Sequence, residues 1–218
     1  MLRRRIGTRY SSAMNCRTSG PHPWANHPEL LTSIRSPWDK FRKADWNFDR
    51  YEDAIMSRPC DSEAVVYTAL DFCVAMVALR DWTRKTLTRE VRQSGKALPA
   101  GMATLDDFPA FIAARVPWQS AIEAIANTIK HADYRDTGWE NGTAMVASFV
   151  PDPLHAAKDA CKDGLELFGF MHQHKDVAWW DIALRQVPST EAEPGYVAFG
   201  DALDEWRAIL DEFGYITD

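Results

Sequence analysis

The chain has no apolar run that approaches the roughly 20 residues needed to cross a membrane as a helix. We therefore expect a soluble, cytoplasmic protein with no membrane partner. Its four cysteines include no close pair, which argues against a disulfide framework and against a zinc knuckle. Reduced thiols are the expectation for such a pattern, and they suit a cytosolic protein. The cysteines are Cys16, Cys60, Cys73 and Cys161.

The common nucleotide-binding signatures are also missing. The chain contains neither the G-x-G-x-x-G fingerprint of dinucleotide-binding folds nor the G-K-[ST] ending of a phosphate-binding loop. A Ser/His/Asp triad is likewise absent. These absences remove the common nucleotide enzymes as leading candidates, and we expect no cofactor.

Acidic residues are absent before Glu29, although this stretch contains five arginines. Proline and glycine repeatedly break its pattern, which predicts an irregular basic tail over residues 1–35. Such a tail is typical of a nucleic-acid arm or an organelle transit signal; the alternative is an overlong gene start, with Met14 as the true first residue. The whole chain has a net charge of −6, so any contact with RNA should be local.

Residues 36–218 predict a single, mainly helical domain of ordinary size. Ser36 followed by Pro37 is a favourable helix start, and Pro59 ends that segment. A second helix is expected over residues 62–93. Its predicted core stripe consists of Val66, Leu70, Val74 and Val77.

The later part of the chain changes from a helical to a mixed pattern. Further helices are predicted over residues 104–114, 118–134, 154–173 and around 199–210, with a strand over 143–150 and an ambiguous segment over 177–187 that could be a strand. The expected fold class is a mainly α helical bundle with a small β element in the C-terminal half. The helices over 62–93 and 118–134 should pack antiparallel at its centre.

Two carboxylates, Asp71 and Asp81, interrupt the apolar middle of the second helix. Each needs a partner if it is buried, because burying a bare carboxylate costs several kcal/mol. Ten residues separate them, which corresponds to about 15 Å along a helix axis. They therefore cannot both touch one small site directly.

The strongest candidate site lies on the helix predicted over residues 118–134. Asn127, Lys130 and His131 are spaced i,i+3 and i,i+4 and so point roughly the same way. His131 can move a proton near neutral pH, Lys130 can neutralise a phosphate, and Asn127 can orient either partner. In the alternative interpretation, one of the two helix carboxylates forms a buried ion pair with the lysine or the histidine and fixes the helix register without chemistry.

A histidine pair, His172 and His174, with His155 upstream, has the residue type of a metal site. The pair ends a predicted helix, where side chains two residues apart diverge. No acidic or cysteine ligand stands nearby at a characteristic spacing. We therefore expect no metal and assign these residues to the carbonyl groups and dipole of the helix C-terminus.

Two segments, residues 69–82 and 125–131, together resemble a widespread set of small, largely uncharacterised bacterial proteins. Those proteins carry A-x-D-F-x-V-T-A-x-x-x-x-D-W and, further along, I-A-N-x-x-K-H. This chain matches both motifs in order, with Ala75-Met76 where Thr-Ala is usual and Thr128-Ile129 where a small pair is usual.

A looser resemblance is to HEPN domains, which are helical bundles that include many metal-independent ribonucleases. Their motif is an arginine, a polar residue, two to four further residues and a histidine. Asn127 takes the polar place and His131 the histidine, but Ala126 stands where the arginine should be. In HEPN ribonucleases the arginine would stabilise charge on the scissile phosphate while the histidine handles a proton, so the missing guanidinium argues against nuclease activity.

Two functions are compatible with these residues. The first is a non-catalytic interaction or structural module, a degenerate HEPN-like bundle that binds a protein partner or forms a homodimer. The second is an RNA-directed effector, a toxin or phage-defence ribonuclease, with His131 as acid/base and with Lys130 and Asn127 on the phosphate. Asp71, Asp81 and Arg80 would then support the site. Lys130, Arg80 or Arg84 would have to replace the missing cation, although a lysine lacks the bidentate fork of arginine.

Overall fold

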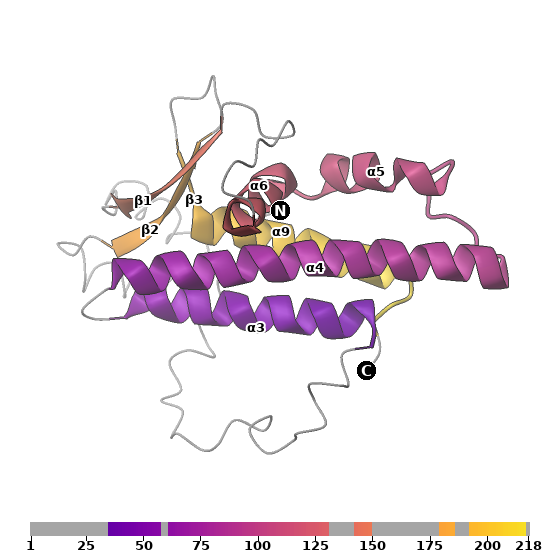
Figure 1. The fold of residues 1–218 in the computed structure, drawn as a ribbon, viewed down its shortest axis with the longest axis horizontal. Helices are drawn as coiled ribbons and strands as arrows, with labels where there is room; N and C mark the ends of the chain where they lie inside the picture. Colours follow the sequence, from indigo (N-terminus) through magenta and orange to yellow (C-terminus); the bar gives the residue numbers. More distant parts are fainter. Residues whose placement is uncertain (1–34, 58–60, 131–141, 150–178, 186–191, 217–218) are drawn as a thin grey trace, which may run out of the picture. The chain divides into compact units, whose positions relative to one another are not determined.

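The computed structural model describes five stretches of the chain, coloured in Figure 1. They are residues 35–57, 61–130, 142–149, 179–185 and 192–216. Contacts divide the chain into two units, one of Thr32–Ala147 with Trp180–Asp218 and one of Met1–Leu31 with Ser148–Trp179. Nearly all described residues belong to the first unit. The tail predicted over residues 1–35 falls outside them except for its last residue, and the single domain over 36–218 stays a prediction.

The first two helices begin where the sequence predicts. Helix α3 (Pro37–Met56) starts with a capping box, because the Ser36 hydroxyl accepts the Asp39 N–H at 3.1 Å while the Asp39 carboxylate accepts the Ser36 N–H at 3.0 Å. Helix α4 (Ser62–Ser94) ends at Gly95, whose φ of 65° favours glycine. Local capping chemistry therefore fixes both boundaries.

The rest of the described chain confirms a mainly helical fold with a small sheet in its C-terminal half. The β-strand expected over 143–150 is β1, and the ambiguous segment over 177–187 contains β2. The helix expected over 154–173 lies outside the described residues. The remaining elements are the short 3-10 helix η2 (Leu105–Asp107), α5 (Phe108–Arg115), α6 (Gln119–Lys130), β1 (Thr143–Phe149), β2 (Trp179–Arg185), β3 (Glu193–Pro194) and α9 (Gly195–Glu212).

Aromatic side chains join three helices in the core. Phe72 of α4 lies between Phe48 of α3 and Phe199 of α9, with ring centroids 5.6 and 5.0 Å apart. All three rings are fully buried or nearly so. Burial of such rings removes a large apolar area from water and so stabilises the packing of the three helices. Figure 1 shows α3 running alongside α4, with α9 behind them.

The core face of α4 differs from the predicted stripe. Val66, Leu70 and Val74 are only half-buried, and Val77 alone of the four is buried. The fully buried face instead carries Val65, Phe72, Cys73, Met76 and Leu79. The prediction was wrong because α4 packs against both α3 and α6 and is apolar over a wide arc, so periodicity alone did not identify the buried face.

A three-stranded sheet follows the helices in the order β1-β2-β3. Strand β2 pairs antiparallel with β3, with Ala183 opposite Pro194 and Leu184 opposite Glu193. Helix α9 begins directly after β3, so the sheet and the last helix are joined without a loop. This junction brings β2 next to the first turn of α9.

Helix α4 is long and apolar enough to cross a membrane by length and composition. Its best 18-residue window has a mean hydropathy of 1.6, and 44% of that window is buried. A core helix of a soluble protein meets the same criteria, and α4 packs against α3 and α6. This is weak evidence for a membrane, and the expected absence of a membrane partner stays a prediction.

Candidate functional site

Two of the three residues of the predicted site, Asn127 and Lys130, lie at the end of the described part of α6. Asn127 is half-buried, and Lys130 is the last residue of the helix. The side chain of Lys130 and the whole of His131 lie outside the described residues. The helix itself is confirmed, and its inner face contains Ile122 and Ala126, both fully buried. Ala126, at the place of the missing arginine, is therefore a core residue.

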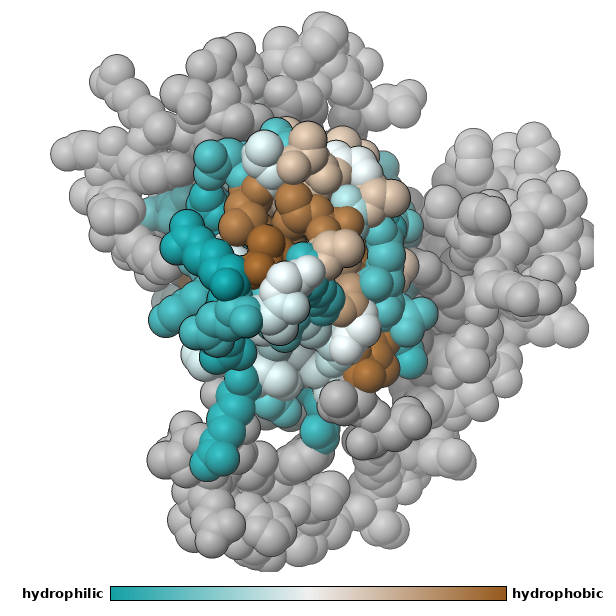
Figure 2. Space-filling view, turned by 90° about the vertical axis from the view of Figure 1, so that its right-hand side faces the viewer, coloured by the Kyte–Doolittle hydropathy of each residue, from teal (hydrophilic) through white to brown (hydrophobic). Residues whose placement is uncertain are grey.

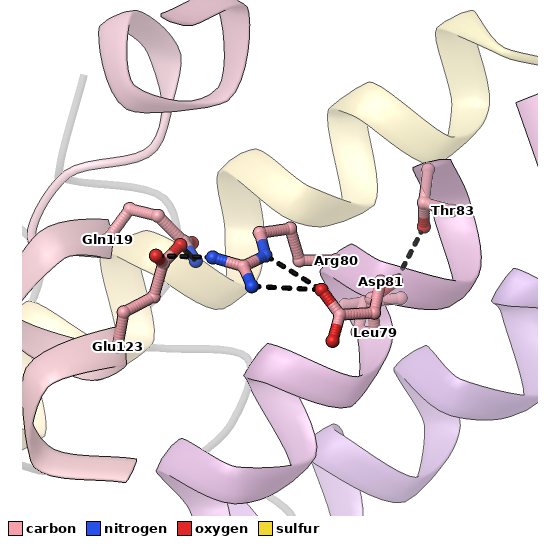
Figure 3. A network of polar contacts seen from close by, with 6 residues as sticks. All are labelled: Leu79, Arg80, Asp81, Thr83, Gln119 and Glu123. Carbon is pink, nitrogen blue, oxygen red and sulfur yellow. Dashed lines mark hydrogen bonds and ion pairs between the residues drawn. The ribbon is translucent and has the colours of Figure 1, made fainter. Parts of the chain in front are cut away.

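Arg80 stands between two carboxylates (Figure 3). Its Nε and Nη2 donate to Asp81 Oδ1 at 3.1 and 2.9 Å, and its Nη1 forms an ion pair with Glu123 of α6. Burial alone would lower the pKa of Arg80, but the Glu123 and Asp81 carboxylates outweigh it and hold that pKa above its ordinary value. The guanidinium is thus charged and already engaged.

The Arg80 network continues through α6 to α9. Gln119 Nε2 donates to Glu123 Oε1 at 2.6 Å, and Trp206 Nε1 of α9 donates to Gln119 Oε1 at 3.0 Å. Gln119 and Trp206 are both buried, so each satisfies a polar group of the other. A single chain of contacts therefore links α4, α6 and α9.

The two carboxylates of α4, one of which the alternative interpretation expected in a buried ion pair, are both at the surface. Asp81 has a side chain that is 60% exposed, and Asp71 is exposed as well. That expectation was wrong because α4 turns both positions away from its buried face, so neither has to be neutralised in the core. The Asp71 backbone carbonyl, rather than its carboxylate, holds α3, since it accepts a hydrogen bond from Asn47 Nδ2 at 3.0 Å.

An apolar hollow of about 410 Å³ lies where α4, α6 and β1 meet. None of Asn127, Arg80, Asp71 and Asp81 is among its described lining residues. Thr128, a polar residue of the lining, donates its hydroxyl to the Ile125 carbonyl at 2.7 Å. The described lining includes Val66, Leu70, Ala124, Ile125, Thr128 and Met145. The hollow thus suits an apolar group rather than a phosphate.

A buried carboxylate that the sequence did not indicate lies on β2. Asp181 is fully buried, and its Oδ1 accepts from the Tyr51 hydroxyl and, at 2.6 Å, from the Ile182 N–H. Its Oδ2 accepts the Tyr196 N–H, in the first turn of α9, at 3.3 Å. Burial raises the pKa of Asp181 to about 6, although these hydrogen bonds oppose the rise. Burial and the nearby carboxylate also raise the pKa of Tyr51 well above its usual value.

Gly195 makes the close approach around Asp181 feasible. A Cβ at this position would lie 2.6 Å from Tyr51 Oη and 3.0 Å from both the Cβ and the carbonyl oxygen of Ile182. The cluster therefore joins α3, β2 and α9 so closely that a side chain at position 195 would not fit without a shift of its neighbours. The signal that could have located it is a lone aspartate inside the apolar run of residues 179–184.

The described residues contain no group of three or more His, Cys, Asp or Glu side chains that could hold a metal ion. His155, His172 and His174 lie outside the described stretches. Cys73 is a free, buried thiol whose pKa is raised by burial, which makes it unreactive at neutral pH.

Comparisons with protein-family models, with curated proteins and with solved structures found no match to this chain. The resemblance to HEPN domains therefore rests on the sequence motifs, and of these the described residues include all but His131.

Proposed function

We propose that the chain is a non-catalytic interaction module, a degenerate HEPN-like bundle that binds a protein partner or a second copy of itself. The observation that carries this proposal is the engagement of Arg80 by Glu123 and Asp81. Arg80 was a candidate to replace the arginine that the motif lacks. Its contacts favour a structural role instead.

A phosphate would have to compete with two carboxylates for the Arg80 guanidinium. Binding it there would bring like charges together and break the contact between α4 and α6. Displacing Glu123 would also disturb its hydrogen bond from Gln119, which is buried. A guanidinium that must first leave the Glu123 and Asp81 carboxylates is poorly preorganised for catalysis.

The surface next to the apolar hollow is suited to a protein partner. Strand β1 lies at one edge of the sheet and contains neither a charged residue nor a proline. Met145 on this strand is 56% exposed. Uncharged edge strands beside an apolar hollow pair readily with another chain, because their backbone groups are open and no like charge opposes the approach.

The test compares two exposed apolar residues. Met145→Lys places a charge on the β1 edge, whereas Tyr67→Lys changes a residue of α4 that is 64% exposed and does not line the hollow. We expect the mass in solution, or the capture of a partner from a lysate of the source, to fall with Met145→Lys and to be unchanged with Tyr67→Lys. Equal effects of both substitutions would remove β1 from the proposal.

The second candidate is an RNA-directed effector in which His131 is the acid/base and Lys130 and Asn127 bind the phosphate. Four exposed cations on the C-terminal half of α4 favour it, namely Arg84, Lys85, Arg89 and Arg92. Expression of wild type and His131→Ala in a bacterial host, with growth and total RNA followed, separates the two candidates. Growth arrest with RNA cleavage in wild type alone would replace the interaction module by a nuclease, and intact RNA in both supports the module.

A further inference from the structure

The C-terminal half of α4 presents four cations without a carboxylate partner in the described part of the chain. All four side chains are exposed, and none takes part in an ion pair with a described residue. Figure 2 faces the end of the bundle at which α4 terminates, where hydrophilic side chains form a band along one side of a hydrophobic area. The basic face consists of Arg84, Lys85, Arg89 and Arg92.

Helical geometry gathers these residues on one side of α4. Lys85, Arg89 and Arg92 follow the i, i+4, i+7 spacing, and Arg84 lies on the same half of the helix. From Arg84 to Arg92 the helix rises about 12 Å. Together with Asp81, Thr88 and Gln93, they line a shallow depression.

Both acidic residues within this part of the helix are already paired with a cation, and Asp81 shares its cation, Arg80, with Glu123. Asp81 binds Arg80, and Glu90 binds Lys96 Nζ at 2.8 Å and the Tyr215 hydroxyl at 2.9 Å. The basic face therefore keeps its four positive charges on a chain whose net charge is −6. Such a local contrast marks a place where an anionic partner would be attracted.

The composition of the basic face selects among anionic partners. It contains no aromatic or large apolar side chain, whereas a protein interface needs apolar anchors at its centre and a membrane-binding helix needs residues that insert among the lipids. Phosphate contacts need only cations and hydrogen-bond donors, which Thr88 and Gln93 add. Three of the four cations are arginines, whose planar fork matches phosphate oxygens.

We propose that the basic face of α4 binds the phosphodiester backbone of a nucleic-acid strand without reading its bases. Four cations over about 12 Å can meet three or four consecutive phosphates of one strand of a duplex. Binding requires neither cleavage of the strand nor the β1 surface, so it holds independently of the function proposed above.

The experiment measures binding of the full chain to a fluorescently labelled strand of about 20 nucleotides by anisotropy, at salt concentrations from about 50 to about 200 mM. For a single strand, each phosphate contact contributes about −0.7 to the slope of log K against log salt. Four phosphate contacts predict a slope of about −2.8 for log K against log salt. The variant Arg89→Ala/Arg92→Ala should halve that slope and weaken binding by roughly tenfold or more at the lowest salt. Strands of polyuridine and of polyadenosine should bind with the same affinity.

The matched control is Lys43→Ala/Arg207→Ala, which removes two exposed cations from α3 and α9. It changes the net charge equally and should leave binding within about twofold. RNA and DNA strands, each single and duplex, form separate arms; binding to any of them that depends on Arg89 and Arg92 supports the proposal. Absence of binding to every strand, an equal loss in the control, or equal binding of a poly-glutamate peptide would overturn it.

Discussion

Two polar clusters join elements of this bundle, and they balance charge in different ways. Arg80 is half-buried between two carboxylates, so opposite charges meet directly. Asp181 is fully buried, and among the described residues it accepts hydrogen bonds from neutral groups alone, the nearest being Tyr51. The pairing raises the pKa of Arg80, whereas the pKa of Asp181 rises to about 6 despite its hydrogen bonds. Ion pairing thus preserves a charge that neutral donors cannot fully protect from burial.

The largest effect should come from filling the space beside the buried cluster. Gly195→Ala would place a Cβ 2.6 Å from Tyr51 Oη, a distance that forces the backbone or the Tyr51 ring to shift. We expect the free energy of unfolding to fall by about 3 kcal/mol, as overpacking of a core does. Denaturant titration measures it.

Gly200 supplies the control for that substitution within the same helix. The nearest atom to a Cβ at Gly200 is Phe48 Cζ at 3.5 Å, an ordinary contact. Gly200→Ala should therefore stabilise α9 by roughly 0.5–1 kcal/mol, since alanine is the better helix former. If Gly195→Ala were equally harmless, the cluster would be looser than its distances indicate.

The second-largest effect should be a pH dependence of stability, which distinguishes the Asp181 cluster from the Arg80 cluster. Asp181 has a pKa of about 6 in the folded chain against 3.8 ordinarily, so the folded state keeps a proton that the unfolded state has lost. The free energy of unfolding should therefore fall as the pH rises from about 4 to about 6, by roughly 2–3 kcal/mol for this group, and then level off.

Asp181→Asn removes that pH dependence. It replaces the cost of burying a charged carboxylate with the cost of a buried amide that has a mismatched partner. The asparagine oxygen can still accept from Tyr51 and Ile182, but its NH₂ would face the Tyr196 N–H that Oδ2 now accepts. We expect the variant to be less stable than wild type at pH 4, by about 1 kcal/mol, and more stable at pH 8. Urea titrations across this range give both curves, and parallel curves would contradict the assignment of the slope to Asp181.

Removing a single hydroxyl gives a smaller, matched comparison. Tyr51→Phe takes a donor from the buried Asp181 and should cost about 1.5–2 kcal/mol, because a hydrogen bond to a charged group is lost in the core. Tyr215→Phe removes a similar bond, 2.9 Å long, to Glu90, which Lys96 also neutralises near the surface. Its cost should stay below about 1 kcal/mol. Thermal unfolding of both variants decides whether burial sets the difference.

Local chemistry made the helix boundaries predictable from sequence. The Ser36-Pro37 start of α3 and the Gly95 cap of α4 depend on residues within one turn, and the start at Pro37 and the expected range 62–93 are confirmed to within one residue. The buried face of α4 was not predictable, since it depends on which two helices cover an apolar cylinder. Fold class therefore followed from the sequence more readily than side-chain placement.

The polar clusters show the same limit. Arg80 and Asp81 stood out because charges inside an apolar helix are conspicuous, yet their partner Glu123 comes from another helix. Asp181 was missed because its partner Tyr51 lies 130 residues earlier in the chain. A lone charge inside an apolar run can indicate burial, but the sequence pattern does not identify a partner that lies on another element. The site hypothesis at Asn127, Lys130 and His131 stays a prediction for its last two side chains.

The smallest effect should come from the paired cluster. Glu123→Gln removes one of the two carboxylates around Arg80, while Asp81 remains and the glutamine oxygen can still accept from Gln119. Because the Arg80 and Glu123 side chains are 28% and 23% exposed, water and salt screen their attraction, and we expect a loss of only about 0.5–1 kcal/mol that shrinks further in high salt.

Glu212→Gln, in the ion pair of Glu212 with Arg115, is the control of similar exposure and should lose about as much. A loss above about 2 kcal/mol for Glu123→Gln alone, unaffected by salt, would contradict this prediction. The contact between Arg80 and Glu123 would then stabilise the fold as strongly as the contacts of the buried Asp181 cluster. Burial, rather than pairing, would then explain the difference between the Arg80 and Asp181 clusters. Arg80 would also be held in its contacts more strongly than the interaction-module proposal requires.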